Sequence, residues 1–164
     1  KYTVTFQTFS KSYAMCGYRL GYAVGPRLLI DAMTKTHVYS TISAPTISQM
    51  VGAKALSMDP KYTEAMRKEY DKRRKVIVKR LNQMGLPTVQ PNGAFYTFSN
   101  IKDVTDDSFK FAFQLLKEAK VAVVPGKEFG TYGEGYIRCS YATALPKIEM
   151  AMDRIEKFVK KWKK

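Results

Sequence analysis

Residues 8–22, TFSKSYAMCGYRLGY, form the most informative stretch of this 164-residue chain. The stretch joins two apolar segments and carries short hydroxyl side chains, glycines and two cations, Lys11 and Arg19. Hydroxyls and a guanidinium fork suit a phosphate group, and an amine held out of water beside a second cation becomes a competent nucleophile. On composition alone, an ordinary polar loop with two solvated cations is the simpler interpretation.

The order of these residues closely resembles the lysine motif of the class I/II aminotransferases, pyridoxal-phosphate enzymes of fold type I. By this resemblance, Lys11 forms the Schiff base with pyridoxal 5'-phosphate and Arg19 binds its phosphate. Thr8 stands where the family usually has a phosphate-binding serine, and Ser10 is a second hydroxyl near the phosphate. The resemblance also implies that the freed Lys11 amine moves a proton from the substrate Cα, as transamination requires.

Three later segments extend the resemblance in the same order along the chain. Residues 91–98, PNGAFYTF, resemble the family's P-x-G-A-F-Y segment, and residues 121–130, VAVVPGKEFG, resemble its V-x-V-x-P-G-x-x-F-G segment. Residues 136–142, YIRCSYA, resemble the R-x-S-x-A segment, whose arginine binds the substrate α-carboxylate. This implies that Arg138 is the substrate-binding arginine, since a bidentate arginine fixes both the charge and the orientation of a carboxylate.

The resemblance covers essentially the whole chain and implies the C-terminal part of a fold type I enzyme, of α/β class with an α+β portion. Residues 1–45 would be the tail of the large cofactor domain. Residues 46–164 would be the small domain, including a linking helix at about 60–84. The family's groups that hold the pyridine ring precede its lysine motif, so we expect the isolated chain to be inactive and the full-length enzyme to be a homodimer.

Hydrophobic periodicity predicts a mixed order of strands and helices. We expect strands at residues 2–6, 20–24, 94–99, 121–124 and 135–141. Pro26 opens a first helix, and a polar stretch at 36–49 precedes a short helix that ends near Ser57. A long helix runs from Asp59-Pro60 to about Met84, and further helices are expected at 107–119 and from about Leu145. On the helix at 107–119, the side chains expected to face inward are Phe109, Ala112, Phe113 and Leu116.

The chain is strongly basic, with 28 Lys and Arg against 14 Asp and Glu. Residues 68–80 hold seven cations, which we interpret as the solvated face of a long amphipathic helix. No nucleic-acid-reading motif accompanies the charge, so nucleic acid is not an expected partner. A non-catalytic basic binding module that meets an acidic partner remains an alternative, as does a pyridoxal-phosphate lyase or synthase with the same loop.

The expected substrates are an α-amino acid and a 2-oxo acid. Residues 34–48 contain no arginine, which argues against one way in which family members bind dicarboxylic substrates. A single histidine and two distant cysteines, Cys16 and Cys139, predict no metal site; we interpret both cysteines as free, small buried side chains. Because the sequence has neither a secretory signal nor an apolar run of about 18 residues, we expect no membrane association and a cytoplasmic location.

Overall fold

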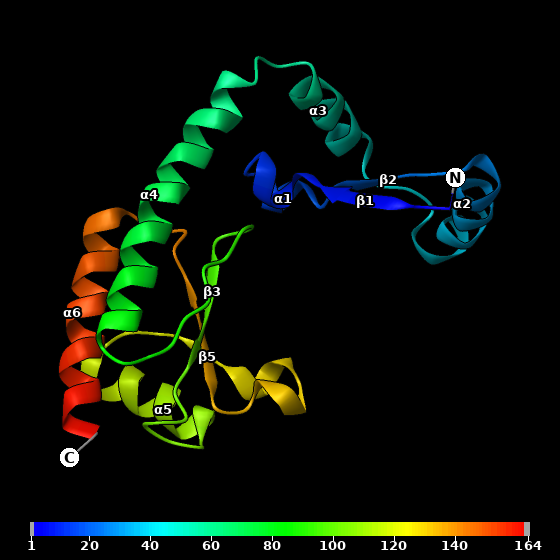
Figure 1. Cartoon of the computed structure of the whole chain (residues 1–164). Coiled ribbons are helices and arrows are strands. Elements are labelled where there is room, and N and C mark those ends of the chain that lie inside the picture. Colours follow the sequence, from blue (N-terminus) through cyan, green and yellow to red (C-terminus); the bar gives the residue numbers. More distant parts are fainter. Residues whose placement is uncertain (1, 163–164) are drawn as a thin grey trace. The chain divides into compact units, whose positions relative to one another are not determined.

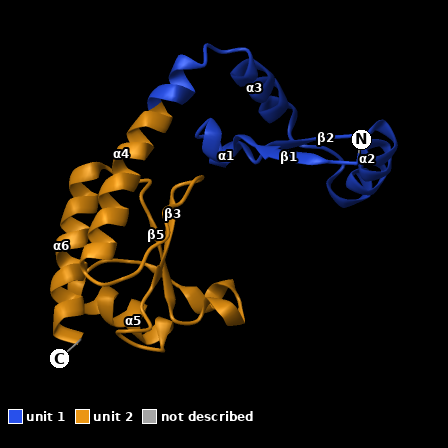
Figure 2. Ribbon diagram, in the orientation of Figure 1, with its two compact units in different colours: residues 1–65 blue, residues 66–164 orange. Residues whose placement is uncertain are grey.

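The computed structural model describes residues 2–162. The chain forms two compact units, Lys1–Ala65 and Met66–Lys164, here called unit 1 and unit 2 (Figure 2). The division falls within helix α4 (Lys61–Gln83), which therefore contributes residues to both units. The division into a large-domain tail and a small domain near residue 45 concerns a complete enzyme and stays a prediction.

Unit 1 contains a hairpin of β1 (Thr5–Thr8) and β2 (Gly21–Val24), which pair antiparallel. The hairpin connection holds the short helix α1 (Phe9–Ser12) and a 3₁₀ turn (Cys16–Tyr18). Helices α2 (Arg27–Thr41) and α3 (Thr46–Leu56) follow (Figure 1).

The polar stretch at 36–49 is helical at both ends, since α2 continues through Thr41 and α3 begins at Thr46. The hydroxyls of Thr34, Thr36 and Ser40 each donate a hydrogen bond to the carbonyl four residues earlier. These bonds give the hydroxyls a partner within the helix, so the polar side chains do not end it.

Unit 1 has a small core and much uncovered apolar surface. Its buried hydrophobic cluster consists of four residues, Phe9, Met15, Leu20 and Ala55. Helix α2 buries none of its residues. Large apolar side chains of α2, of α3 and of the segment between them are exposed, among them Leu28, Tyr39, Ile42, Ile47 and Met50. Exposed large apolar side chains in such number are typical of a surface that other protein or a ligand covers.

Unit 2 contains a three-stranded antiparallel sheet in the order β3 (Tyr96–Asn100), β5 (Tyr136–Ser140), β4 (Val124–Pro125). Strand β4 is shorter than the predicted 121–124, because only Val124 and Pro125 pair with β5 before the chain enters a 3₁₀ turn. Helix α5 (Ser108–Gln114) continues into a π-helical turn (Leu115–Ala119).

Helices α4 and α6 (Leu145–Trp162) lie side by side in unit 2 (Figure 1). Arg80 of α4 joins them through ion pairs to Asp153, at 2.6 Å, and Glu156, at 3.2 Å. The predicted limits of α4 are confirmed by its ends. Asp59 Oδ1 accepts the Lys61 backbone N–H at 2.8 Å, and Gly85 adopts a φ of +78°, which ends the helix.

The core of unit 2 lies among the sheet, α4, α5 and α6. Ala112 is buried as predicted, but the predicted inward positions Phe109, Phe113 and Leu116 are exposed at 59%, 56% and 49%. Helix α5 and the turn after it instead bury Phe111 and Leu115. The segment carries two apolar stripes, and the stripe that meets α6 is the buried one. Phe111 packs edge-on against Phe158 and Trp162 of α6, with ring centroids 5.4 and 5.7 Å away.

Among the helices formed by residues 2–162, none combines the length and the apolar content needed to cross a bilayer.

Candidate functional site

The loop between β1 and β2 gathers the four residues that the sequence assigns to the cofactor. Thr8 caps α1: its Oγ1 accepts the Ser10 backbone N–H at 3.2 Å and lies 3.1 Å from Ser10 Oγ. Lys11 follows in the same short helix, and Arg19 ends the 3₁₀ turn on the other flank of the loop. One hairpin connection therefore carries two hydroxyls, an amine and a guanidinium.

Helix α3 packs against this loop and fixes its backbone. The buried Ser48 donates a hydrogen bond from Oγ to the Tyr18 carbonyl at 2.7 Å. Leu20 and Phe9 pack against Gly52, where an added Cβ would overlap the Leu20 side chain and lie 3.3 Å from the Phe9 ring. The absence of a side chain at Gly52 thus allows the close approach of α3 to the loop.

Cys16 lies between the two cations of the loop, a position that the sequence analysis missed. Its Sγ is 3.8 Å from Lys11 Nζ and 3.0 Å from the Ser10 carbonyl, and its own carbonyl accepts Arg19 Nη1 at 2.9 Å. Cys16 is exposed, so the expectation of a buried side chain was wrong for it. The expectation of a buried side chain is confirmed for Cys139, where burial raises the thiol pKa to about 11. Both cysteines are free.

The charge and geometry of the loop suit an anion. The first 30 residues contain no Asp or Glu, so no carboxylate of this segment competes for Lys11 or Arg19. Arg19 adopts a left-handed φ of +51°, which a non-glycine residue holds only when its surroundings fix it. A guanidinium and two hydroxyls are donors that suit a phosphate group. These residues therefore fit the phosphate of the cofactor that the sequence implies.

Arg138, the predicted carboxylate-binding residue, belongs to unit 2 and lies on β5. Its guanidinium carbon lies 4.5 Å from the centroid of the Tyr96 ring and 4.7 Å from that of the Phe129 ring. The side chain is half-buried, and no carboxylate within residues 2–162 forms an ion pair with it. Tyr96 and Phe129 are further residues that the sequence analysis did not assign to the site.

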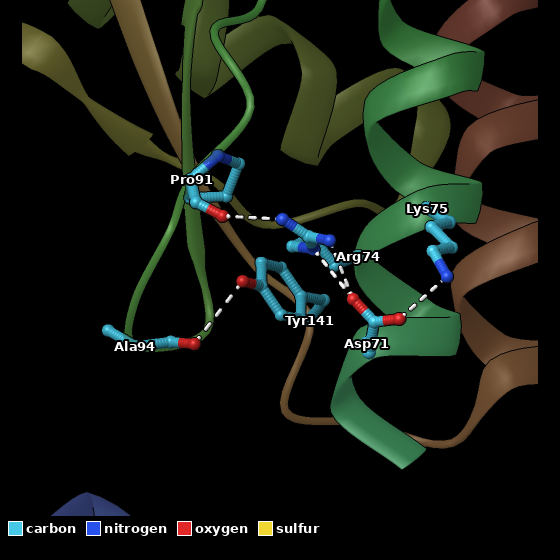
Figure 3. A network of polar contacts seen from close by, with 6 residues as sticks. All are labelled: Asp71, Arg74, Lys75, Pro91, Ala94 and Tyr141. Atoms are coloured by element: carbon cyan, nitrogen blue, oxygen red, sulfur yellow. Dashed lines mark hydrogen bonds and ion pairs between the residues drawn. The ribbon is translucent and has the colours of Figure 1, made fainter. Parts of the chain in front are cut away.

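The loop before β3 is held by hydrogen bonds to two of its carbonyls (Figure 3). Arg74 of α4 donates from Nη1 to the Pro91 carbonyl at 3.0 Å, and the Tyr141 hydroxyl donates to the Ala94 carbonyl at 3.2 Å. Ala94 has a left-handed φ of +56°. The loop leads directly into Tyr96, so these bonds also fix the start of the strand that contacts Arg138.

Asp71 orients Arg74 within this network. Its Oδ1 lies 2.6 Å from Arg74 Nη2, and its Oδ2 lies 2.7 Å from Lys75 Nζ. Hydrogen bonds from Lys75 and Arg74 lower the pKa of the Asp71 carboxyl, so the ionised form is favoured. Burial raises the pKa of Tyr141, which keeps its hydroxyl protonated as a donor to the loop.

The sequence matches the family described as aminotransferase class I and II over residues 1–155. It is 52% identical to an aspartate aminotransferase of Pyrococcus abyssi and 48% identical to aromatic-amino-acid aminotransferase 2 of Thermococcus litoralis. Each match covers 98% of this chain but 42% of the relative. The chain therefore spans less than half the length of these curated relatives.

Solved structures agree with the sequence match. An aromatic aminotransferase from Pyrococcus horikoshii OT3 superposes with a TM-score of 0.89 at 52% identity, over 97% of this chain and 43% of the other. An aspartate aminotransferase from Thermotoga maritima gives a TM-score of 0.87 at 36% identity, over 96% of this chain and 40% of the other. The mixed α/β structure thus matches part of the fold type I aminotransferases. The chain belongs to the class I and II aminotransferase family.

Proposed function

We propose that this chain is the C-terminal part of an enzyme that transfers an amino group between an α-amino acid and a 2-oxo acid. Residues 1–45 would complete the large domain and residues 46–164 would form the small domain. The family uses pyridoxal 5'-phosphate, which when bound stabilises negative charge at the substrate Cα. The exposed apolar faces of α2 and α3 support this assignment, since the remainder of a large domain would cover them.

The observation that carries the proposal is the meeting of Lys11, Arg19 and the Thr8 and Ser10 hydroxyls on one acid-free hairpin loop. Arg19 and the hydroxyls would bind the cofactor phosphate and hold its reactive carbon near Lys11. The Lys11 amine would attach the cofactor covalently and then, once displaced by substrate, remove the proton from the substrate Cα. Both roles need one amine at one position, which the supported loop backbone supplies.

Arg138 would bind the α-carboxylate of the amino acid and of the 2-oxo acid. Its half-buried guanidinium has no carboxylate partner within the described part of the chain, so a ligand carboxylate would meet an unmatched charge. A bidentate pair holds the carboxylate in one plane. The substrate Cα would then keep a constant position relative to Arg138.

The test is Lys11→Ala in the full-length enzyme that contains this sequence, with Lys157→Ala as the matched control. Lys157 is an exposed lysine of α6. We expect Lys11→Ala to lower kcat for amino transfer by at least about a hundredfold, as removal of a general base does, and Lys157→Ala to leave it unchanged. Retention of full activity by Lys11→Ala would refute the proposal.

The products distinguish this reaction from other reactions of the same cofactor. Amino transfer converts the 2-oxo acid acceptor into an amino acid, whereas an elimination enzyme releases ammonia without an acceptor. Aspartate and phenylalanine should both be tried as donors, since the relatives named above include an aspartate and an aromatic enzyme. The isolated 164-residue chain should show no transfer; activity without added protein would contradict its assignment as an incomplete part.

We propose that the complete enzyme is a homodimer, and its mass in solution, measured by light scattering at several concentrations, is the direct check. A monomeric, fully active enzyme would refute it.

A further inference from the structure

Arg138 is part of a stack of rings and cations on the exposed face of the β3–β5 sheet. The rings of Phe98 and Tyr136 are stacked, with centroids 5.0 Å apart and planes 10° apart. Phe129 meets Phe98 edge-on at 5.9 Å and lies against the guanidinium of Arg138. The ring of Tyr96 lies against the same guanidinium. Arg138 is therefore bounded by two aromatic rings from different segments.

The turn that carries Phe129 is held closely against β5. A Cβ on Gly126 would overlap the Gly133 carbonyl oxygen and lie 2.7 Å from the Tyr136 carbonyl oxygen. Gly130, directly after Phe129, has a φ of +103° and a backbone N–H that donates to the Lys127 carbonyl at 3.1 Å. This packing admits only glycine at the contact positions. It sets the backbone of the Phe129 turn independently of the Phe129 side chain.

The backbone before Tyr96 is held by a different set of contacts. Tyr96 follows the loop whose Pro91 and Ala94 carbonyls are bonded to Arg74 and Tyr141. Both rings around Arg138 thus stand on backbone that other contacts keep in place. A guanidinium that is attracted to aromatic rings can still form hydrogen bonds through its N–H groups, which lie in its plane.

We propose that Tyr96 and Phe129 are positioning residues for carboxylate binding. Their rings fix the plane of the Arg138 guanidinium and present its N–H edge to the α-carboxylate of the amino acid and the 2-oxo acid. This inference rests on the proposed function, because it assigns the two rings a role through Arg138. It requires aromatic character at both positions and not merely apolar volume.

The experiment compares leucine with aromatic replacements in the full-length enzyme. Phe129→Leu and Tyr96→Leu remove a ring but keep an apolar side chain, whereas Phe129→Tyr and Tyr96→Phe keep the ring. We expect each leucine variant to raise KM for both substrates by roughly tenfold, the value of one partly desolvated cation–π contact. The aromatic variants should stay within about twofold, and kcat should change little in all four.

Binding without turnover gives a second measurement. An α-methyl amino acid has no Cα proton to transfer, so its Kd reports substrate binding without the proton-transfer step. Its Kd should rise in the leucine variants by the same factor as KM. The matched control is Tyr132→Leu, since Tyr132 lies in the next turn and is 99% exposed. This control should leave both constants unchanged.

Arg138→Lys distinguishes a failure of the ring inference from a failure of the proposed carboxylate site. If Arg138→Lys raises KM while the leucine variants, like the aromatic variants, leave KM within about twofold, the role of the rings is refuted and the proposed function stands. If Arg138→Lys leaves KM unchanged, the carboxylate site and the ring inference both fail. A tenfold effect of Tyr132→Leu would also overturn the inference, because general disturbance of the turn would then explain the result.

If a leucine variant fails to fold, pentafluorophenylalanine at position 129 provides the second test. This residue keeps the shape of the ring but reverses the charge of its face. We expect KM to rise as in Phe129→Leu, and an unchanged KM would refute the role of the ring.

Discussion

Phe111→Ala should destabilise unit 2 far more than Phe113→Ala, although both residues are phenylalanines of the same short helix. Phe111 is 0% exposed and Phe113 is 56% exposed. Removing a fully buried phenylalanine costs about 3–5 kcal/mol through lost transfer energy and the remaining cavity. Because Phe111 also loses its edge-on contacts with Phe158 and Trp162, the upper part of this range applies. Phe113→Ala should cost less than about 1 kcal/mol.

The assay is urea unfolding of the 164-residue chain, followed by tryptophan fluorescence. Trp162 is the single tryptophan of the chain, and it packs against Phe158 and Phe111 in the core of unit 2. Its emission therefore reports the unfolding of this unit. The midpoint should fall strongly for Phe111→Ala and little for Phe113→Ala, with the slope of the transition unchanged.

Equal losses in the two variants, or a larger loss at position 113, would refute the assigned orientation of α5. Such a result would return the buried stripe to Phe109, Phe113 and Leu116, as the sequence pattern alone predicts. Leu116→Ala is a second check on the exposed stripe, since Leu116 is 49% exposed. It should behave like Phe113→Ala.

Three further changes test other parts of the chain. Asp59→Ala removes the side-chain cap of α4 and should cost about 1 kcal/mol in urea unfolding, whereas Asp59→Ser should cost little. Gly52→Leu should overpack the contact between α3 and the β1–β2 loop, at a cost of about 1–3 kcal/mol. If this loop binds the cofactor as proposed, the change should also weaken pyridoxal-phosphate binding by the full-length enzyme in absorbance titrations. Gly93→Leu, where a new Cβ meets nothing within 4 Å, should leave that binding unchanged. Hydrogen bonds from Ser108 lower the pKa of Glu134 below its ordinary 4.5. The ionised carboxylate therefore contributes to folding stability above pH 4.5, and this contribution is lost as the pH falls through the lowered pKa of the folded state. Glu134→Gln should therefore be less stable than the unsubstituted chain at pH 7, with the difference closing in acid; a constant difference across a pH series would refute this.

The sequence predicted the parts of the fold that local chemistry decides. Asp59-Pro60 and Gly85 determined both ends of α4, because a capping carboxylate and a left-handed glycine act within a few residues. The lysine loop was predicted from the order of its residues, and the structure brings Thr8, Ser10, Lys11 and Arg19 onto one hairpin connection. Their chemical roles stay predictions.

Contacts between distant segments could not be predicted in the same way. Helix α5 carries two apolar stripes of similar strength, and only the position of α6 decides that Phe111 is buried and Phe113 is not. The place of Cys16 between two cations depends on the path of the 3₁₀ turn and not on periodicity. The rings around Arg138 come from β3 and from a turn before β5, so no local pattern joins them.

The hydrogen bonds to the Pro91 and Ala94 carbonyls have a thermodynamic consequence for the carboxylate binding proposed at Arg138. A loop that becomes ordered only when ligand arrives subtracts its lost conformational entropy from the affinity. Here the left-handed Ala94 and its neighbours lose that freedom when unit 2 folds, before any ligand is present. The entropic cost therefore lowers the stability of the folded protein and does not reduce its affinity for the ligand. Loosening this loop should weaken binding mainly through a less favourable entropy, with the binding enthalpy nearly unchanged.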